Sequence, residues 1–322
     1  MRSLITGIGG FAGGHLAAAL LERDAEVAGI DTATGQRLES IQDRIAFTKG
    51  DIRNTDAIRD AVNKLHPEVI YHLAAITNVG RAWTKRRETL EVNVVGTSAV
   101  LEVAAELEPK PTVVLASTGE IYGPPPPDSR PLTEDDPTHP QSPYAVSKMC
   151  AELLARQAWE SEGVPTVILR MFNYTGPWQS PSFVCSDFAR QVAWAEAGLI
   201  KPRMSVGNLE SLRDFSDIRD ITEGYLLAAE HGQSGQAYNL ANGTAVRIGD
   251  VLKYLLRSAN VDIDVQKDAN RLRPADLVAL RGDANRARKQ LGWKPSFTLE
   301  ETLDSVLEFW RQQVAKKNWS AQ

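Results

Sequence analysis

The chain has 322 residues, of which 43% are hydrophobic and 24% charged, as is typical of a globular protein with a full core. Its net charge of -5 argues against a basic surface for nucleic acid, and no apolar run approaches the ~20 residues that a membrane span needs. Only Cys150 and Cys185 could pair, so no disulfide framework is implied. The first residues lead into an expected strand rather than a long apolar signal segment, and we expect a cytoplasmic protein.

Strand and helix signals alternate through the first half of the chain. Short apolar, β-branched runs predict strands at 3–5, 26–30, 45–48, 68–73, 112–116 and 164–170, with a late strand at 236–240. Helical spacing of apolar residues predicts helices at 13–21, 55–65, 93–107 and 143–161. This alternation predicts an α/β fold, a Rossmann-type doubly wound parallel sheet with helices on both faces.

After about Met171 the alternation breaks down into turn-rich segments, further helices and a tail helix over 299–314. We expect a smaller, discontinuous C-terminal substrate lobe there. The expected division is a dinucleotide-binding domain over 1–170, to which 214–240 return, and a substrate lobe of 171–213 and 241–322. The proline run 124–127 and the residues up to Thr138 predict either a rigid loop over the cleft or a plain surface loop.

A glycine-rich turn follows the first expected strand and opens the first helix. Gly7, Gly10 and Gly13 have the Gly-x-x-Gly-x-x-Gly spacing, with Phe11 and Ala12 between the last two. Such a turn lets the backbone approach a pyrophosphate, and the helix N-terminus offers free N–H groups and a positive dipole end. In this strand–turn–helix context the pattern predicts a dinucleotide site.

Acidic and small residues at the next strand ends extend this site. Asp31 closes the second strand, where a carboxylate accepts hydrogen bonds from ribose hydroxyls and repels a 2′-phosphate. NAD(H) is therefore favoured, with NADP(H) as the alternative because Arg37 lies close by in sequence. Asp51-Ile52 suits contact with the adenine, although Asp51 could instead cap a helix. Leu73-Ala74-Ala75 leaves space for the cofactor.

A proton-transfer group is expected on the helix over 143–161. Tyr144 and Lys148 are four residues apart and share a helix face. A nearby ammonium should lower the pKa of the tyrosine, whose hydroxyl can then exchange a proton with the substrate oxygen. Thr118, after the preceding strand, can hydrogen-bond that oxygen. Glu120 is a candidate base or sugar ligand, or else a structural carboxylate, and no metal site is expected.

These motifs together resemble the extended short-chain dehydrogenase/reductases that modify nucleotide sugars, over essentially the whole chain. The shared motifs are Gly7-x-x-Gly10-x-x-Gly13, Asp51-Ile52, His72-Leu73-Ala74-Ala75, Asn93-x-x-Gly96-Thr97, Thr118 and Tyr144-x-x-x-Lys148. The resemblance implies an NAD(P)-dependent enzyme and adds Asn93 to the residues expected to bind the cofactor.

Further motifs resemble the GDP-mannose branch of that family, which holds GDP-mannose 4,6-dehydratases and GDP-4-keto-6-deoxy-D-mannose reductases. The substrate-binding residues that this resemblance implies are Asn173, Val184, Arg190, Asn208, Arg213, Arg273 and Asp276. Guanidinium groups bind phosphate oxygens in a bidentate fork, so Arg213 and Arg273 suit the pyrophosphate of a GDP-linked sugar. Asp276 could accept the ribose hydroxyls.

Between the two enzymes the sequence favours the reductase. The run 117–123 is similar to the reductase form, and Gly119 stands where the dehydratases usually carry a polar residue. Two residues depart from the family pattern, Tyr174 in place of a histidine and Trp178 in place of a glycine, and both are expected to change the shape of the sugar pocket. The leading expectation is reduction of the C4 keto group of GDP-4-keto-6-deoxy-D-mannose to GDP-D-rhamnose.

Three other functions stay open. A GDP-mannose 4,6-dehydratase would use Glu120 to take the C5 proton, and a nucleotide-sugar 4-epimerase would also retain its NAD. A redox-sensing binding protein on the same fold is disfavoured because Tyr144 and Lys148 are both present. In the resembled family, helices such as 93–107 and 143–161 commonly form a four-helix homodimer interface. Ala104, Ala105, Ala151 and Leu154 fit that arrangement, unless these faces pack within the monomer.

Overall fold

A seven-stranded parallel sheet forms the centre of the molecule in the computed structural model, which describes residues 1–126, 128–268 and 279–316. The strands lie in the order β10-β6-β5-β4-β1-β2-β3, and every neighbouring pair is parallel. They are β1 (Arg2–Thr6), β2 (Glu26–Asp31), β3 (Ile45–Lys49), β4 (Val69–His72), β5 (Thr112–Thr118), β6 (Thr166–Met171) and β10 (Ala237–Leu240). This confirms the doubly wound sheet and each strand predicted for it.

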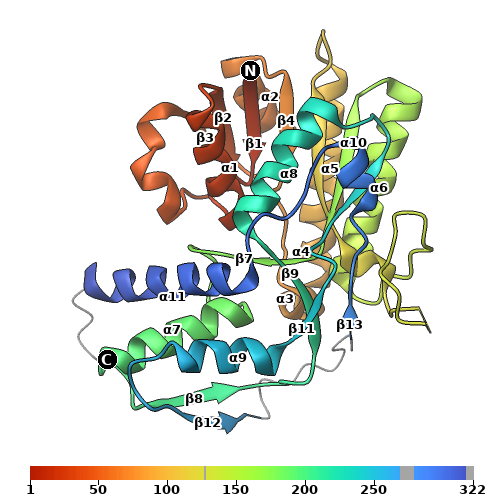
Figure 1. The fold of residues 1–322 in the computed structure, drawn as a ribbon. Helices are drawn as coiled ribbons and strands as arrows, with labels where there is room; N and C mark the ends of the chain where they lie inside the picture. Colours follow the sequence, from red (N-terminus) through yellow and green to blue (C-terminus); the bar gives the residue numbers. More distant parts are fainter. Residues whose placement is uncertain (127, 269–278, 317–322) are drawn as a thin grey trace.

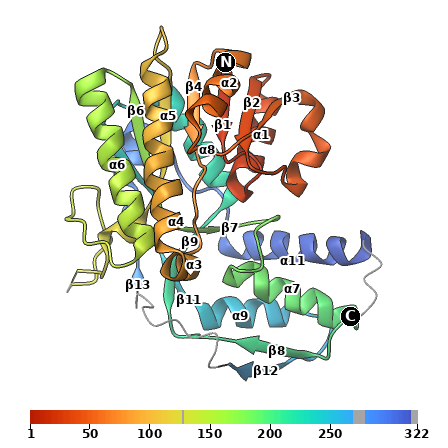
Figure 2. The same ribbon diagram turned by 180° about the vertical axis from the view of Figure 1, so that it is seen from behind.

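Helices cover both faces of this sheet (Figures 1 and 2). Leu16 of α1 (Phe11–Glu22) and Ile221 of α8 (Ile218–His231) pack in one apolar cluster on one face. On the other face, Ile58 of α2 (Thr55–Leu65), Val100 of α5 (Gly96–Ala105) and Ala155 of α6 (Pro143–Glu162) pack in a second cluster. Burial of both sheet faces explains why the strands are almost uniformly apolar.

Capping residues set the ends of α6, which carries Tyr144 and Lys148, and the start of α2, which follows Asp51. The Ser142 hydroxyl accepts the Ala145 N–H, Pro143 occupies the first turn of α6, and Gly163 ends the helix in a left-handed conformation. The Asn54 side chain caps α2 by accepting the Asp56 N–H. The cap of this helix is therefore Asn54, and the alternative prediction that Asp51 caps a helix is wrong.

The expected helix over 93–107 is in fact the last part of a longer helical region. It follows α3 (Val79–Thr84) and α4 (Arg86–Leu90), and it opens with a π-helical turn over Glu91–Val95 before α5. Shorter 3-10 turns complete this lobe, at Gln36–Ser40, Gln42–Arg44 and Gly119–Tyr122. The sequence analysis did not predict α3 and α4.

The second lobe lies beyond the carboxyl ends of the large sheet (Figure 1). Its strands are β7 (Asn173–Thr175), β9 (Leu212–Asp217), β11 (Ala245–Arg247) and β13 (Ala279–Leu280) in one small sheet, and β8 (Arg203–Val206) with β12 (Asp264–Lys267) in another. Its helices are α7 (Val184–Glu196), α9 (Ile248–Arg257) and α11 (Leu299–Lys316), and α10 (Asn285–Gln290) contacts β10. Phe188, Leu252 and Leu307 share its core. Of the helices in the described ranges, none has the length and apolarity to cross a membrane.

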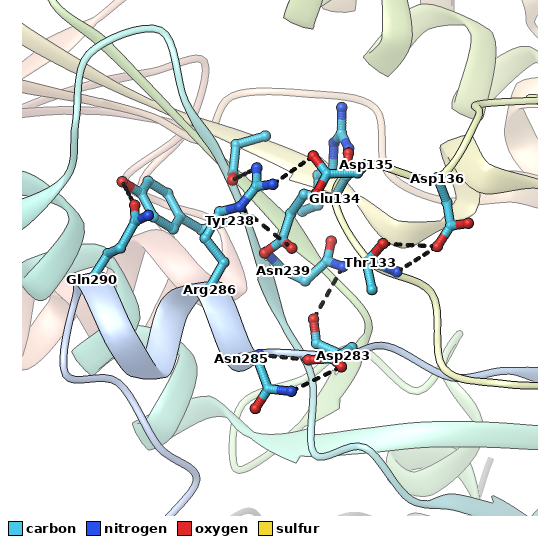
Figure 3. Close-up of polar contacts among 12 residues, drawn as sticks. Thr133, Glu134, Asp135, Asp136, Tyr238, Asn239, Asp283, Asn285, Arg286 and Gln290 are labelled. Carbon is cyan, nitrogen blue, oxygen red and sulfur yellow. Dashed lines mark hydrogen bonds and ion pairs between the residues drawn. The ribbon is translucent and has the colours of Figure 1, made fainter.

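The segment after the proline run does not cover the main cavity. Leu132 pairs with Gly282 as an isolated parallel bridge, and the Arg286 guanidinium forms a 2.6 Å hydrogen bond to Asp135. Glu134 lies beneath, where its carboxylate accepts the Asn239 N–H at 2.8 Å (Figure 3). The described part of this loop is thus fixed beside β10 and α10 and lines no part of the main cavity, so of the two alternatives expected from the sequence the loop over the cleft is wrong and the surface loop remains.

Candidate active site

A cavity of about 760 Å³ lies at the carboxyl ends of the parallel strands, beside the second lobe. Its wall is made by the glycine-rich turn and by residues that follow β2, β4, β5 and β6, together with β7 and two residues of α6. In open α/β sheets this edge is where ligands bind, because the loops after the strands diverge there. The residues that line the cavity include both Asp51, which follows β3, and Tyr144, at the start of α6.

The glycine-rich turn forms one end of this cavity, lined by Gly7, Gly10, Phe11, Ala12 and Gly13. Gly7 has φ +74°, and a Cβ on it would lie 2.7 Å from the backbone of Ala74. Only glycine fits such a close approach in that conformation. The turn leads into the N-terminus of α1, so its free N–H groups fit a dinucleotide pyrophosphate.

Asp31 and Arg37 line different cavities. Asp31 lines the main cavity, and its carboxylate accepts the Gly9 N–H at 2.9 Å and the Thr32 N–H at 2.7 Å. The Arg37 stem packs against Gly14 and borders a second cavity with His15 and other residues of α1 and α8. Arg37 is not in the lining of the main cavity, so the argument for NADP(H) from its nearness in sequence is weakened.

Asp51, Ile52, Leu73, Ala74 and Ala75 all line the cavity, as expected for residues near the cofactor. The Arg53 guanidinium hydrogen-bonds to Asp51 at 2.6 Å and holds the pKa of that carboxyl below its usual range.

Asn93 lies behind the cavity wall instead of lining it. Its side chain accepts the Ile76 N–H at 2.7 Å, donates to the Ile76 carbonyl at 3.0 Å and donates to the Ser147 hydroxyl at 2.9 Å. The amide therefore fixes the segment after β4 against α6. Its effect on a cofactor would be indirect, which corrects the expectation that Asn93 binds it.

Thr118, Glu120, Tyr144 and Lys148 meet at the other end of the cavity. Burial raises the pKa of Tyr144, the negative charge of Glu120 adds to this, and a hydrogen bond with Thr118 opposes it. The lowered tyrosine pKa expected from the sequence is therefore wrong for this arrangement, because burial and the nearby Glu120 charge both raise it. The site holds Tyr144 as a phenol, which is the form that can donate a proton.

Lys148 is buried, and burial lowers its pKa to about 8, against which the charge of Glu152 acts. At neutral pH the ammonium form still prevails. It lies one helical turn from Tyr144, at the wall where a nicotinamide ribose would lie if the glycine turn holds the pyrophosphate.

Of the expected substrate residues that the structure describes, only Asn173 is found in the wall of this cavity. Arg190 pairs with Asp187 at 2.8 Å and lies over the Trp194 ring, and Asn208 donates to the Ser211 hydroxyl at 2.9 Å. Arg213 donates to the Leu212 carbonyl at 2.8 Å. Val184 begins α7 next to the lining residue Phe183. Arg273 and Asp276 lie outside the described residues.

Several aromatic residues in the wall were not predicted as site residues. Tyr174 of β7 stacks on Phe11 with ring centroids 5.9 Å apart, and Tyr225 of α8 and Phe183 also line the cavity. Tyr174 was noted only as a departure from the resembled family. Nothing in local sequence marks Tyr225, because the fold of α8 against β5 and β6 brings it there.

The fold and the site define the class of protein, the extended short-chain dehydrogenase/reductases, which are enzymes with an NAD(P)(H) cofactor. Residues 4–306 match the family model described as GDP-mannose 4,6 dehydratase. The chain belongs to this family.

Individual relatives agree with this assignment. The chain is 32% identical over 98% of its length to GDP-6-deoxy-D-mannose reductase of Pseudomonas aeruginosa, of which it covers 99%. The structure of RMD from Pseudomonas aeruginosa complexed with NADPH has a TM-score of 0.83 at 32% identity, covering 97% of this chain and 99% of that one. UDP-glucose 4-epimerase of Thermus thermophilus, in complex with NAD, has a TM-score of 0.88 at 30% identity and covers 98% and 100%.

Proposed function

We propose that the enzyme reduces the C4 keto group of GDP-4-keto-6-deoxy-D-mannose to give GDP-D-rhamnose. The observation that carries this proposal is the 32% identity, over 98% of the chain, to a GDP-6-deoxy-D-mannose reductase. The grouping of Thr118, Tyr144 and Lys148 at one end of the dinucleotide-sized cavity supports it.

In this reaction a bound nicotinamide dinucleotide supplies the hydride for C4. Tyr144, kept protonated by burial that raises its pKa, donates the proton to the carbonyl oxygen. Thr118 hydrogen-bonds the same oxygen and aligns it. Lys148, an ammonium below its pKa of about 8, holds the nicotinamide ribose hydroxyls. Glu120 binds a sugar hydroxyl beside them.

The glycine between Thr118 and Glu120 favours the reductase over the dehydratase. A Cβ on Gly119 would lie 3.0 Å from the Phe172 ring, so Phe172 occupies the space that a polar side chain would need. The dehydratase is the second candidate, because the Glu120 carboxylate lines the cavity where a base for the C5 proton would be needed. An epimerase is a further candidate on the basis of the similar Thermus thermophilus structure.

NADH is the proposed reductant in preference to NADPH. The Asp31 carboxylate lies in the cavity wall and would repel a 2′-phosphate, while Arg37 borders a different cavity. The similar RMD structure contains NADPH, so this preference is a specific difference proposed for this chain.

The nucleotide half of the substrate is assigned to the smaller lobe, formed by residues 171–213 and 241–322. Residues 1–170 and 214–240 are proposed as the dinucleotide-binding domain, although 214–217 complete β9 in the small sheet of the second lobe. Arg213, Arg273 and Asp276 remain the proposed ligands of the GDP moiety, and Asn173, in the wall of the main cavity, is the proposed ligand nearest the reacting sugar.

A homodimer in the cytoplasm is the proposed state of the enzyme. Six of the exposed large apolar side chains in the described ranges lie on α3 to α6: Trp83, Leu90, Val95, Val146, Leu153 and Trp159. Their helices pack side by side (Figure 2), and a second copy of the chain would cover them. Ala104 and Ala151 are completely buried within one chain, so these two residues are not part of such an interface. Cys150 and Cys185 are free, as in a reducing compartment.

The reaction is tested by adding NADH and GDP-4-keto-6-deoxy-D-mannose to the purified protein. The expected result is stoichiometric loss of NADH absorbance with GDP-D-rhamnose identified by NMR. No oxidation, in protein that carries tightly bound NAD, would overturn the reductase. The dehydratase and the epimerase would then be separated by supplying GDP-mannose and UDP-glucose.

A further inference from the structure

A carboxylate that no step of the proposed reaction uses lies directly behind the reacting groups. Glu152 of α6 is one helical turn beyond Lys148 and is only 3% exposed. One of its oxygens accepts a short hydrogen bond from the hydroxyl of Ser117, the residue before Thr118 on β5. Glu152 therefore contacts the strand that presents Thr118 and lies on the helix that presents Lys148.

The charge of Glu152 is balanced by a buried arginine from the next strand. Arg170 of β6 is 4% exposed, and its Nη2 and Nε donate to Glu152 at 2.8 Å and 3.1 Å. Its Nη1 donates to the Tyr122 hydroxyl at 3.0 Å and to the Glu134 carbonyl at 3.1 Å. A buried ion pair with this many hydrogen bonds has a defined geometry, since any displacement leaves a charge unpaired.

The outer end of the pair is fixed as firmly as the inner end. The Tyr122 hydroxyl donates to Asn239 of β10 at 2.8 Å, and the Asn239 N–H donates to the Glu134 carboxylate at 2.8 Å. Arg286 of α10 then holds the loop from outside through Asp135 (Figure 3). Glu152 thus belongs to a continuous polar network that runs from the active-site wall to the edge of the sheet.

We propose that Glu152 is a positioning residue, which fixes the strand end carrying Thr118 through its hydrogen bond with Ser117 and, from one helical turn away on α6, stabilises the charged form of Lys148. The proposal rests on the proposed function in one respect, namely that Lys148 holds the cofactor ribose. It does not depend on which nucleotide sugar is reduced.

The charges around Lys148 determine how this role can be measured. His72 of β4 faces Lys148 but is neutral, because burial lowers its pKa to about 3. Tyr144 on the same helix is a phenol, Arg170 is paired with Glu152, and Glu120 lines the same end of the cavity. Burial lowers the pKa of Lys148 to about 8, and the charge of Glu152 keeps it from being lower. Neutralising Glu152 should therefore lower that pKa further.

The test is the pH dependence of NADH affinity, measured from the fluorescence of bound NADH between pH 6 and 10. In the wild type we expect affinity to fall through a midpoint near 8, as Lys148 loses its proton. In Glu152→Gln, which keeps the size of the side chain and one acceptor oxygen but removes its charge, the midpoint should move down by about one pH unit. An unchanged midpoint in a folded variant would overturn the proposal.

Two further variants separate positioning from general damage to the fold. Tyr122→Phe removes hydrogen bonds of the same network but leaves both charges, so it should lower the unfolding temperature without moving the midpoint. Glu152→Gln with Arg170→Gln leaves no unpaired buried charge, and it should show the low midpoint even if the single variant does not fold. Equal midpoints for the double variant and the wild type would also overturn the proposal.

Failure of the proposed reaction gives a different result. If wild-type affinity for NADH varies with pH but no keto sugar is reduced, the reaction is wrong and the role of Glu152 stands. If wild-type affinity does not vary between pH 6 and 10, Lys148 does not hold the ribose as an ammonium, and the role of Glu152 falls with it.

Discussion

At the residue scale, the phenol of Tyr144 is the group on which the proposed chemistry most depends. Tyr144→Phe removes the only atom of that side chain that can donate a proton, while the ring keeps its packing. We expect kcat for keto-sugar reduction to fall by about 100-fold or more, and NADH affinity to stay within about twofold. Stopped-flow reduction and fluorescence titration measure the two quantities.

Tyr71→Phe is the matched control for this variant. Tyr71 is also a fully buried tyrosine, but it lies in β4 and does not line the cavity. Its loss of a hydroxyl should leave kcat unchanged. Near-wild-type reduction by Tyr144→Phe would show that another group supplies the proton.

Asp31 should determine the choice between the two nicotinamide dinucleotides. Its carboxylate is held by the Gly9 and Thr32 N–H groups, so it cannot easily turn away from a 2′-phosphate. We expect NADH to bind more tightly than NADPH in the wild type. Asp31→Asn should raise NADPH affinity by about tenfold, because it removes the repulsion while keeping an acceptor oxygen.

The same titration on Asp43→Asn provides the control, since Asp43 lies in a 3-10 turn and does not line the cavity. This substitution should leave both affinities unchanged. Tighter binding of NADPH than NADH by the wild type would mean that Asp31 does not exclude the phosphate.

At the scale of elements, the strands of the large sheet were predictable because burial on both faces makes them apolar. Val69–His72 and Thr166–Met171 are entirely buried, so their sequences carry the signal directly. The strands of the second lobe carry no such signal. β9 reads Leu-Arg-Asp-Phe-Ser-Asp, and β7 is only three residues long, so pairing between distant segments decides both.

The part of the site that consists of short, contiguous motifs could be predicted from the sequence. The glycines Gly7, Gly10 and Gly13 lie in the turn between β1 and α1, Thr118 ends a strand, and Tyr144 and Lys148 lie near the start of a helix. All of them line one cavity. Asn93 shows where motif matching stops, because its amide holds the backbone of Ile76 instead of facing the cavity. The pair of Glu152 and Arg170 was not predicted, since its partners come from α6 and β6, which are brought together only by the sheet.

The helices α3 to α6 carry the proposed dimer interface, and this can be tested on two exposed side chains. Val95 and Leu153 are each 53% exposed, one at the end of the π-helical turn and the other on α6. An aspartate at either position would place a charge in the interface, so Val95→Asp or Leu153→Asp should give a monomer at low micromolar concentration. Analytical ultracentrifugation measures the mass.

Ala197→Asp is the control for these variants, because Ala197 is exposed at the end of α7, away from the helices in question. It should leave the dimer intact. A wild type that sediments as a monomer at the same concentration would rule out the proposed homodimer.

At the scale of the whole molecule, contacts of α1 connect the sheet with the second lobe. His15 of α1 donates through Nε2 to the Pro177 carbonyl at 2.9 Å and meets the Phe11 ring edge-on. Phe11 in turn stacks on Tyr174 of β7. The His15 side chain is buried close to Arg37, so its positively charged, doubly protonated form is strongly disfavoured.

This position makes the stability of the molecule depend on pH in a specific range. Burial lowers the pKa of His15 to about 4, with the Arg37 charge adding to the effect, whereas the unfolded chain takes up a proton near 6.5. Between these values the unfolded state binds more protons, so the free energy of unfolding falls as the pH is lowered.

His15→Gln keeps a donor for Pro177 but cannot titrate. Between pH 6.5 and 4, the variant should lose up to about 3 kcal/mol less of its free energy of unfolding than the wild type does, as measured by urea unfolding. His72, whose pKa is also lowered by burial, accounts for part of the pH dependence that remains. His231→Gln changes an exposed histidine at the end of α8 and should keep the pH dependence of the wild-type unfolding free energy. If His15→Gln shows the same pH dependence as the wild type, His15 is not buried in its neutral form.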